Sequence, residues 1–384
     1  MLTQRVSTAI LMIVFIASSV ILLYGRYQQR PVTIPAREAP HPPAIRPRSP
    51  GNYIKVLSLD GSGIRMLPAL HCLANLEERA GKPVSQMFDV IVGTSSGGLI
   101  AAALTALAED GTPLFTAKHL LETYPKVMQR MHAAPLIHPL LSLEGRSAPR
   151  YLTRERHRVL LELFGKTSQL GDALTTVILP AYAVDLHTPF FFASDMGKST
   201  VPGDGPRRSA TEAGDYFLAD ALTASTGDPA LFAPSRITNT GHEQSFTFIS
   251  AQIYAANPTL IAVGETLLRF PGKQCVVISL GAGTPEDDAF SPHTAWTLNS
   301  AENLIDAAAT GNAATTSQIT SLLHRFGSGP VAAYIRLDPV IPGASSQPDD
   351  FSKTNIDKLN KAGEKLTAEK AATLERTAAF LATQ

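Results

Sequence analysis

The sequence is poor in cysteine and has no excess of charge of either sign, and both features exclude classes of protein. Cys72 and Cys275 are the only two cysteines among 384 residues. Two cysteines form no disulfide framework, so we expect both to be small buried residues. The 33 basic residues balance 33 acidic residues, so no broad basic field indicates a nucleic acid partner. The ten histidines lack a metal-ligand spacing such as H-E-x-x-H, so we predict no metal site.

One long uncharged run stands at the amino terminus. Val6 to Tyr24 is 19 residues without a charge, bracketed by Arg5 and Arg26. A helix needs roughly 20 apolar residues to cross the hydrocarbon core of a membrane. A signal peptide is the alternative, but its apolar region is normally shorter and no clear small-x-small cleavage site precedes Tyr24. We therefore predict a single transmembrane anchor in residues 1–26.

The charges around this run bear on the side of the membrane that holds the body of the protein. Five arginines between residues 26 and 48 outnumber Arg5 and the amino terminus, and the positive-inside rule then favours a cytoplasmic body. A short amino-terminal tail with one arginine also suits the opposite topology. The sequence therefore predicts a membrane location and leaves the side open.

Behind the anchor, the chain divides into a spacer and one large domain. Residues 31–50 contain seven prolines, which favour extended geometry and withhold backbone donors. We predict a semi-rigid linker over residues 27–52. The remaining residues, 53–384, are enough for one α/β domain with a full core.

Strand-like runs in this domain alternate with helical stretches. The runs are 53–59, 87–92, 174–184, 245–252, 274–280 and 331–337. Such alternation is typical of a mostly parallel sheet sandwiched by helices. Gly111 to Phe164 is less regular, and we expect either a mobile cover over the site or a helical insertion. Ile356 to Leu381 is amphipathic and is expected to pack on the body.

The most informative motif is Gly93-Thr94-Ser95-Ser96-Gly97, which follows a short apolar run and leads into a helix-like stretch. A G-x-S-x-G sequence between a strand and a helix is a nucleophile elbow, where glycines permit a sharp turn that presents the serine hydroxyl. The positive end of the following helix favours developing negative charge. We predict Ser95 as the nucleophile, with Gly93, Gly97 and Gly98 shaping the turn. The alternative is an ordinary glycine-rich turn.

A second glycine turn, Asp60-Gly61-Ser62-Gly63-Ile64-Arg65, precedes the elbow and also follows a predicted strand. In an open parallel sheet, the carboxyl ends of neighbouring strands form the edge where ligands bind. We therefore expect both turns to lie at one edge. The backbone N–H groups of Gly61, Ser62, Gly63 and Ile64 are our candidates for an oxyanion hole beside Ser95.

With both turns in view, the chain resembles the patatin-like phospholipase family. The hallmarks of that family are a D-G-G-G-x-R loop, a G-T-S-x-G-G elbow and a distant Asp-Gly-Gly or Asp-Gly-Ala motif. Residues 60–65 are similar to the loop and residues 93–98 to the elbow, and similar segments follow in order over roughly residues 53–370. The resemblance implies a patatin-like α/β fold. It also implies a serine acyl hydrolase that cleaves phospholipids or other acyl lipids without a cofactor.

The sequence departs from the family where a catalytic aspartate is expected. Alignment on residues 256–258 places Ser250 at the aspartate of the family's Ser–Asp dyad, with other residues replacing both following glycines. A serine hydroxyl does not ionise near pH 7, so Ser250 is no general base. Asp228 lies in a segment where the family usually has alanine, and it is a candidate for a relocated acid. The alternative is that Asp228, which precedes a proline, only shapes a turn.

Other residues and a second function are alternatives to this reading. His187 and His242 flank the expected site and are candidates for a base beside Ser95. Asp220 is placed similarly to Asp228 but falls in an expected helix. We expect an active, membrane-tethered lipid acyl hydrolase. The alternative is a catalytically degenerate patatin-like domain that binds lipid or a protein partner.

Overall fold

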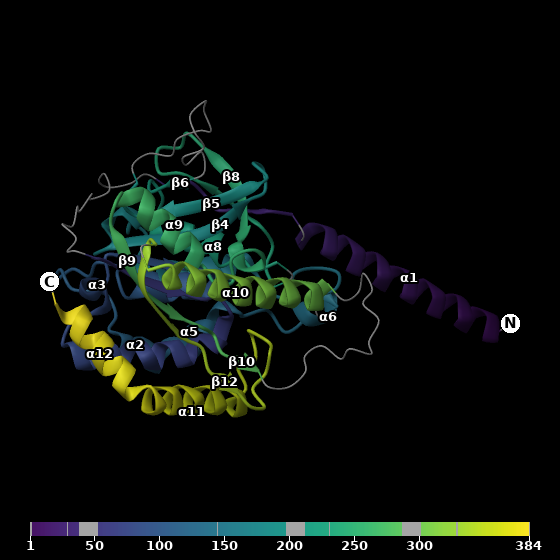
Figure 1. Ribbon diagram of the computed structural model, residues 1–384. Helices are drawn as coiled ribbons and strands as arrows, with labels where there is room; N and C mark the ends of the chain where they lie inside the picture. The colour runs from purple at the N-terminus through teal and green to yellow at the C-terminus, as the bar shows by residue number, and fades with distance from the viewer. Residues whose placement is uncertain are drawn as a thin grey trace.

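The computed structural model of the protein describes residues 2–28, 30–37, 53–143, 145–196, 212–229, 231–285, 301–327 and 329–383. Most of the predicted linker, residues 27–52, lies outside these described residues. The body is an α/β domain built on a ten-stranded sheet, with helices packed around it (Figure 1). This confirms the predicted fold class of a mostly parallel central sheet with helices.

Eight strands cross the sheet in the order β1-β7-β8-β4-β3-β2-β9-β11, and β5 and β6 extend it beside β4. The central strands from β4 to β11 pair in parallel, whereas β5 and β8 run antiparallel to β4. The strands are β1 (Val32–Thr33), β2 (Tyr53–Leu59), β3 (Val90–Gly93), β4 (Thr176–Ala183), β5 (Thr188–Ala193), β6 (Glu212–Ala213), β7 (Ser235–Thr238), β8 (Ser245–Ser250), β9 (Gln274–Leu280) and β11 (Val331–Leu337). Two short strands, β10 (Thr284–Pro285) and β12 (Val340–Ile341), form a separate pair.

Helices cover both faces of the sheet, because its central strands bury both sets of side chains. In β2, Ile54 and Val56 belong to the core shared with α9, whereas Leu57 and Leu59 belong to the larger core shared with α2, α4 and α8. This is the period-two pattern of a strand buried on both faces. The helices are α1 (Leu2–Gln28), α2 (Leu67–Ala80), α3 (Val84–Met87), α4 (Ser96–Ala103), α5 (Ala117–Met131), α6 (His138–Ser142), α7 (Thr153–Phe164), α8 (Leu218–Ser225), α9 (Thr259–Arg269), α10 (Ala301–Arg325), α11 (Lys353–Glu369) and α12 (Ala371–Ala382).

Most predicted elements are present, with three adjustments. The strand expected at 87–92 begins later, because residues 84–87 form helix α3. The stretch 111–164 contains helices α5, α6 and α7, so it is a helical insertion. The amphipathic stretch 356–381 forms two helices, α11 and α12, which pack on α2. Cys72 and Cys275 are buried and form no disulfide, as predicted.

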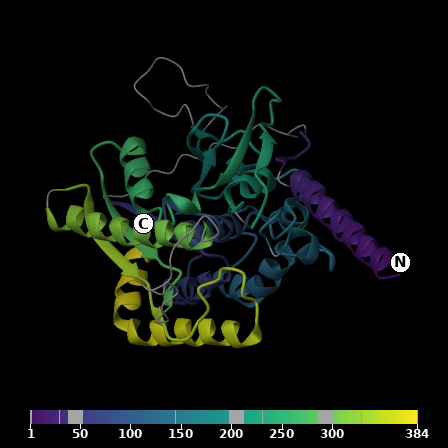
Figure 2. The same ribbon diagram turned by 90° about the vertical axis from the view of Figure 1, so that its right-hand side faces the viewer.

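Helix α1 projects from the body in both views (Figure 1, Figure 2). Its last turns meet the body, where Tyr24 contacts His138 and Gly25 lies against Ser147. The predicted transmembrane anchor in residues 1–26 is not supported: across the described residues, no helix combines the length and the apolar character that a membrane span requires.

Candidate active site

Ser95 lies at the turn between strand β3 and helix α4, where the motif predicts it. Its φ of 48° and ψ of −118° are values that residues with a side chain rarely adopt, and such strain is found at functional turns. An added Cβ at Gly93 would come 2.3 Å from the carbonyl oxygen of Gly97, and one at Gly97 would come 2.4 Å from that of Asp60. At Gly98 it would come 2.9 Å from the Gly93 carbonyl oxygen. Close backbone approach therefore requires these glycines.

Asp228 follows helix α8, and its carboxylate reaches the predicted nucleophile. The Ser95 hydroxyl donates a hydrogen bond of 3.0 Å to Asp228 Oδ2. Burial raises the pKa of Asp228, while hydrogen bonds from the Ser250 and Ser95 hydroxyls and the charge of Arg156 lower it. A carboxylate in this position can accept the proton of the hydroxyl that it binds.

Ser250, where the resemblance places the missing aspartate, lies next to Asp228. It ends strand β8, and its N–H donates a 2.9 Å hydrogen bond to the carbonyl of Gly227. The Ser250 hydroxyl is one of the groups that lower the pKa of the Asp228 carboxyl. The segment between α8 and β7 thus brings a carboxylate beside the position where the resemblance places the family's aspartate.

The loop from Gly61 to Ile64 lies beside the elbow, and its outer N–H groups are bound to the protein backbone. The Gly61 N–H donates to the Ala256 carbonyl at 3.0 Å, and the Ile64 N–H donates to the Pro348 carbonyl at 2.9 Å. These two groups hold the loop in place. They are therefore less suited to bind a substrate oxygen than the two N–H groups between them.

The two inner N–H groups of the loop are held by the hydroxyl of Ser96. Ser62 and Gly63 donate to Ser96 Oγ at 3.0 and 2.9 Å. The buried Tyr124 hydroxyl donates to the Gly63 carbonyl at 2.8 Å, which fixes the next peptide of the loop, between Gly63 and Ile64. A substrate oxygen must therefore replace the Ser96 hydroxyl before it can bind these donors.

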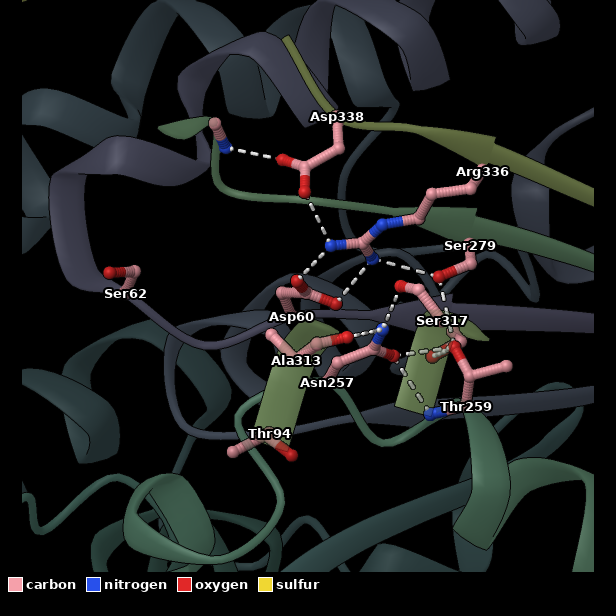
Figure 3. A network of polar contacts seen from close by, with 12 residues as sticks. Asp60, Ser62, Thr94, Asn257, Thr259, Ser279, Ala313, Ser317, Arg336 and Asp338 are labelled. Atoms are coloured by element: carbon pink, nitrogen blue, oxygen red, sulfur yellow. Dashed lines mark hydrogen bonds and ion pairs between the residues drawn. The ribbon is translucent and has the colours of Figure 1, made fainter. Parts of the chain in front are cut away.

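A buried ion pair connects the start of this loop with the far end of the chain. Arg336 on β11 donates to both carboxylate oxygens of Asp60, at 2.8 and 2.6 Å, and to Asp338 at 2.8 Å. Figure 3 shows the Arg336 guanidinium between the two carboxylates. Burial raises the pKa of Asp60 to about 6, against the opposing effect of Arg336. The pair fixes the residue from which the loop departs.

Two cavities flank Asp228 and differ in polarity. The inner cavity, of about 10 Å³, is lined largely by apolar side chains, including Leu99, Met128, Met131, Leu231 and Phe232. The outer cavity, of about 70 Å³, has polar side chains in its lining, including Ser62, Arg150, Gln252, Asp306 and Gln347. Ser95 lines the inner cavity and Asp228 lines both.

The other candidate bases are not brought to Ser95. His187 and His242 are exposed, in turns with φ of 51° and 57°, and neither lines the two cavities around Asp228. Asp220 lies in α8 and forms an ion pair of 2.9 Å with Arg37. Asp228 is thus the acidic candidate that the structure places in hydrogen-bond contact with the predicted nucleophile.

Sequence reasoning missed Ser96, Tyr124 and Arg156. The last two come from helices α5 and α7 of the insertion and are fully buried. In α7, Arg156 belongs to the buried face that also holds Val159 and Leu160. A charged residue on the apolar face of an amphipathic helix is the signal that would have identified Arg156.

Comparison with known proteins shows the family of the chain. Residues 57–263 match the family model described as patatin-like phospholipase. Patatin-like protein 2 and patatin-like protein 1 of Arabidopsis thaliana are each 28% identical to the chain; each match covers 84% of this chain, and 84% and 83% of those proteins. The solved structure of VipD from Legionella pneumophila aligns with a TM-score of 0.32 and 13% identity over 83% of this chain and 67% of that chain, which adds nothing to the assignment. On the family match, the chain belongs to the patatin-like phospholipase family.

Proposed function

We propose that this protein is a lipid acyl hydrolase in which Ser95 is the nucleophile and Asp228 is its base. The observation that supports the proposal most directly is the 3.0 Å hydrogen bond from the Ser95 hydroxyl to Asp228 Oδ2. The substrate class, an ester of a phospholipid or another acyl lipid, follows from the family. The base comes from a different segment than the family motif, because that motif position holds Ser250.

In the first half of the reaction, Asp228 accepts the Ser95 proton while the serine oxygen attacks the ester carbonyl carbon. The carbonyl electrons move to its oxygen and form a tetrahedral oxyanion. Collapse of this intermediate breaks the bond to the alcohol oxygen, which takes the proton from Asp228. Burial, which raises the pKa of Asp228, makes its carboxylate a stronger base for these transfers.

In the second half, water releases the acyl group from Ser95. Asp228 takes a proton from the water as the water oxygen attacks the acyl carbon. The acyl–oxygen bond to Ser95 then breaks, and the serine oxygen recovers the proton from Asp228. The fatty acid leaves and the site returns to its starting state.

The N–H groups of Ser62 and Gly63 are the donors that this mechanism assigns to the oxyanion. They bind Ser96 Oγ in this structure, so the Ser96 side chain rotates away as the substrate oxygen enters. The bond from Tyr124 to the Gly63 carbonyl holds the loop during this exchange. Loss of one oxyanion donor typically lowers the rate by roughly 100- to 1,000-fold.

The two cavities suggest how a lipid is oriented. The inner cavity is apolar but, at about 10 Å³, is too small for an acyl chain as it stands. Met128 and Met131 line it, and the unbranched methionine side chain rearranges readily. We assign the acyl chain to this side and the polar part of the lipid to the outer cavity.

Activity-based labelling tests the proposal. A fluorophosphonate probe should label the folded protein, and Ser95→Ala should abolish the label. Asp228→Asn should lower hydrolysis of a short-chain ester by about 100- to 10,000-fold, the usual contribution of general acid–base catalysis. Unchanged turnover in Asp228→Asn would exclude Asp228 as the base.

A domain that binds lipid or a protein partner without catalysis is the second candidate. Two observations favour it: the replacement of the motif aspartate by Ser250, and the occupation of the Ser62 and Gly63 N–H groups by Ser96. Absence of fluorophosphonate labelling in protein that is shown to be folded would support this candidate over the hydrolase.

A further inference from the structure

Arg156 is a buried charge beside the proposed dyad that the mechanism above does not use. Its side chain extends from α7 and is 0% exposed. It lines the inner cavity together with Ser95 and Asp228. Its guanidinium carbon lies 4.0 Å from the centre of the Phe232 ring. Burying an arginine is costly unless hydrogen bonds and a counter-charge compensate.

The hydrogen bonds of Arg156 go to the segment that carries Asp228. Its Nη2 donates to the Thr223 carbonyl at 2.7 Å, and its Nη1 donates to the Thr226 carbonyl at 2.8 Å. Thr223 lies in the last turn of α8, and Thr226 ends that helix two residues before Asp228. An arginine at the carboxyl end of a helix satisfies carbonyls that lack an intrahelical partner.

Gly227 makes room for this contact. A Cβ at this position would lie 3.0 Å from Arg156 Nη2. The Gly227 carbonyl also accepts the Ser250 N–H. The peptide before Asp228 is therefore held between the guanidinium on one side and the end of β8 on the other.

The counter-charge of Arg156 is Asp228. Burial lowers the pKa of Arg156 to about 9, and the charge of Asp228 is what opposes this shift. Burial lowers the pKa of the neighbouring His132 and His157 to about 4, so both rings are neutral at pH 7. Of the remaining nearby charges, Asp220 pairs with Arg37, Asp60 pairs with Arg336 and Arg150 pairs with Asp349, while Asp306 lines the outer cavity.

We propose that Arg156 is a positioning residue of the reaction: it fixes the two carbonyls that place Asp228, and its charge keeps the Asp228 carboxylate ionised beside Ser95. This inference rests on the proposed function, because it assigns Arg156 a role through Asp228. It adds a third member to the dyad, supplied by the helical insertion. The relocated aspartate is usable as a base because a buried cation lies behind it.

The first experiment separates the charge of Arg156 from its packing. Arg156→Met removes the charge at similar length, and Arg156→Lys keeps a charge; Arg158→Met, on the exposed side of the same helix, is the matched control. We expect Arg156→Met to lower kcat for a short-chain ester by at least about tenfold with a small change in KM. The acid limb of its kcat profile should move up by about one pH unit. Arg156→Lys should keep the wild-type acid limb at a lower kcat.

The acid limb is interpreted against the other charged groups around the site. These are His132 directly after α5, His157 on α7, Asp220 on α8, Asp60 before the loop, and Arg150, Asp306 and Asp349 on the side of the outer cavity. These groups are present in all three variants, so a shift confined to Arg156→Met is assigned to the lost charge. A uniform loss of activity without a shift would show a merely structural role and would overturn the proposal. So would an acid limb that moves equally in Arg156→Lys.

If Arg156→Met folds poorly, denaturant unfolding tests whether the charges of Arg156 and Asp228 are coupled. Asp228→Asn should destabilise the protein when Arg156 is present, because the substitution removes the negative charge that compensates the buried guanidinium. It should not destabilise the protein when residue 156 is methionine. Equal destabilisation in both backgrounds would overturn the charge coupling. The outcome is independent of catalysis: if Asp228→Asn keeps full activity while the two residues remain coupled, the proposed function fails and the charge coupling is structural.

Discussion

At the residue scale, Asp228 and Ser250 lie on different segments whose backbones are adjacent. The Ser250 N–H binds the carbonyl of Gly227, the residue before Asp228. We therefore expect a carboxylate at position 250 to reach the Ser95 hydroxyl as Asp228 does. This adjacency gives a physical route for the relocation of the aspartate that we propose.

Moving the carboxylate back tests this route. Asp228→Ala should reduce the rate of ester hydrolysis by about 100-fold or more. Adding Ser250→Asp to this variant should raise its rate again by at least about tenfold. The control pairs Asp228→Ala with Ser245→Asp, which puts the same charge at the opposite end of β8. Initial rates on a soluble ester provide the measurement. Equal rates for the two double variants would refute the idea that the positions are interchangeable.

Ser96 carries the second prediction at this scale. Because its hydroxyl occupies the Ser62 and Gly63 N–H groups, Ser96→Ala frees both donors. We expect kcat/KM for an ester to rise by up to about tenfold, with stability lowered by about 1 kcal/mol for the lost hydrogen bonds. Steady-state kinetics and urea unfolding measure the two effects. A fall in kcat/KM would mean that the hydroxyl organises the loop and does not block it.

The sequence predicted Ser95 and made Asp228 a candidate, because both residues lie in segments that resemble motifs of the family. It did not identify Ser96, Tyr124 or Arg156, because hydrogen-bond partners such as the Gly63 carbonyl depend on tertiary contacts. The hydrogen bonds that Ser96 accepts from the Ser62 and Gly63 N–H groups could not be predicted for the same reason. A sequence motif predicts which backbone segments lie close together. It does not predict whether a backbone N–H group in them already donates to a side chain of the protein.

At the scale of elements, strands were predicted best and the insertion least well. β2, β9 and β11 begin and end where the apolar pattern places them. The pattern is clearest in β9, which is buried along nearly its whole length and leaves a continuous apolar run. The insertion was harder to read because prolines punctuate it. Pro125 lies inside α5, where a helix is usually expected to break.

The elbow provides the prediction at this scale. Gly97→Ala places a Cβ 2.4 Å from the Asp60 carbonyl oxygen, so the turn must distort. We expect loss of fluorophosphonate labelling and a decrease in unfolding free energy of about 1–3 kcal/mol. The control is Gly264→Ala in α9, where an added Cβ meets nothing within 4 Å, and which should be neutral or stabilise the helix by about 0.5–1 kcal/mol. Similar results for the two variants would argue against a sterically tight elbow.

At the scale of the whole molecule, the buried ring of His132 makes a contribution to stability that is lost in mild acid. His132 packs against Tyr151, Phe232 and Phe351, and burial lowers its pKa from 6.5 to about 4. Between these pH values the native protein binds fewer protons than the unfolded chain. The contribution of His132 is therefore present above pH 6.5 and is lost as the pH falls toward 4.

Unfolding free energies at pH 7 and pH 4.5 measure this contribution. His132→Phe keeps an aromatic ring in the cluster and removes the titrating group, although it also loses the bond from the ring to the Met128 carbonyl. We expect the pH-dependent loss to be smaller in the variant by about 1–3 kcal/mol. The comparison is made between slopes, because Asp60 and Asp220, whose pKa values burial raises to about 6, change stability in the opposite direction. Parallel slopes would contradict the assignment.

The ion pair between Asp60 and Arg336 joins positions 276 residues apart in the chain. A ribosome therefore releases both members of the proposed dyad well before it releases the arginine that anchors the neighbouring loop. Until β11 joins the sheet, the nascent polypeptide contains its serine and its carboxylate, but the loop that would bind the ester oxygen is not yet anchored. We accordingly expect chains that end before residue 331 to be inactive toward esters even when they contain Ser95 and Asp228.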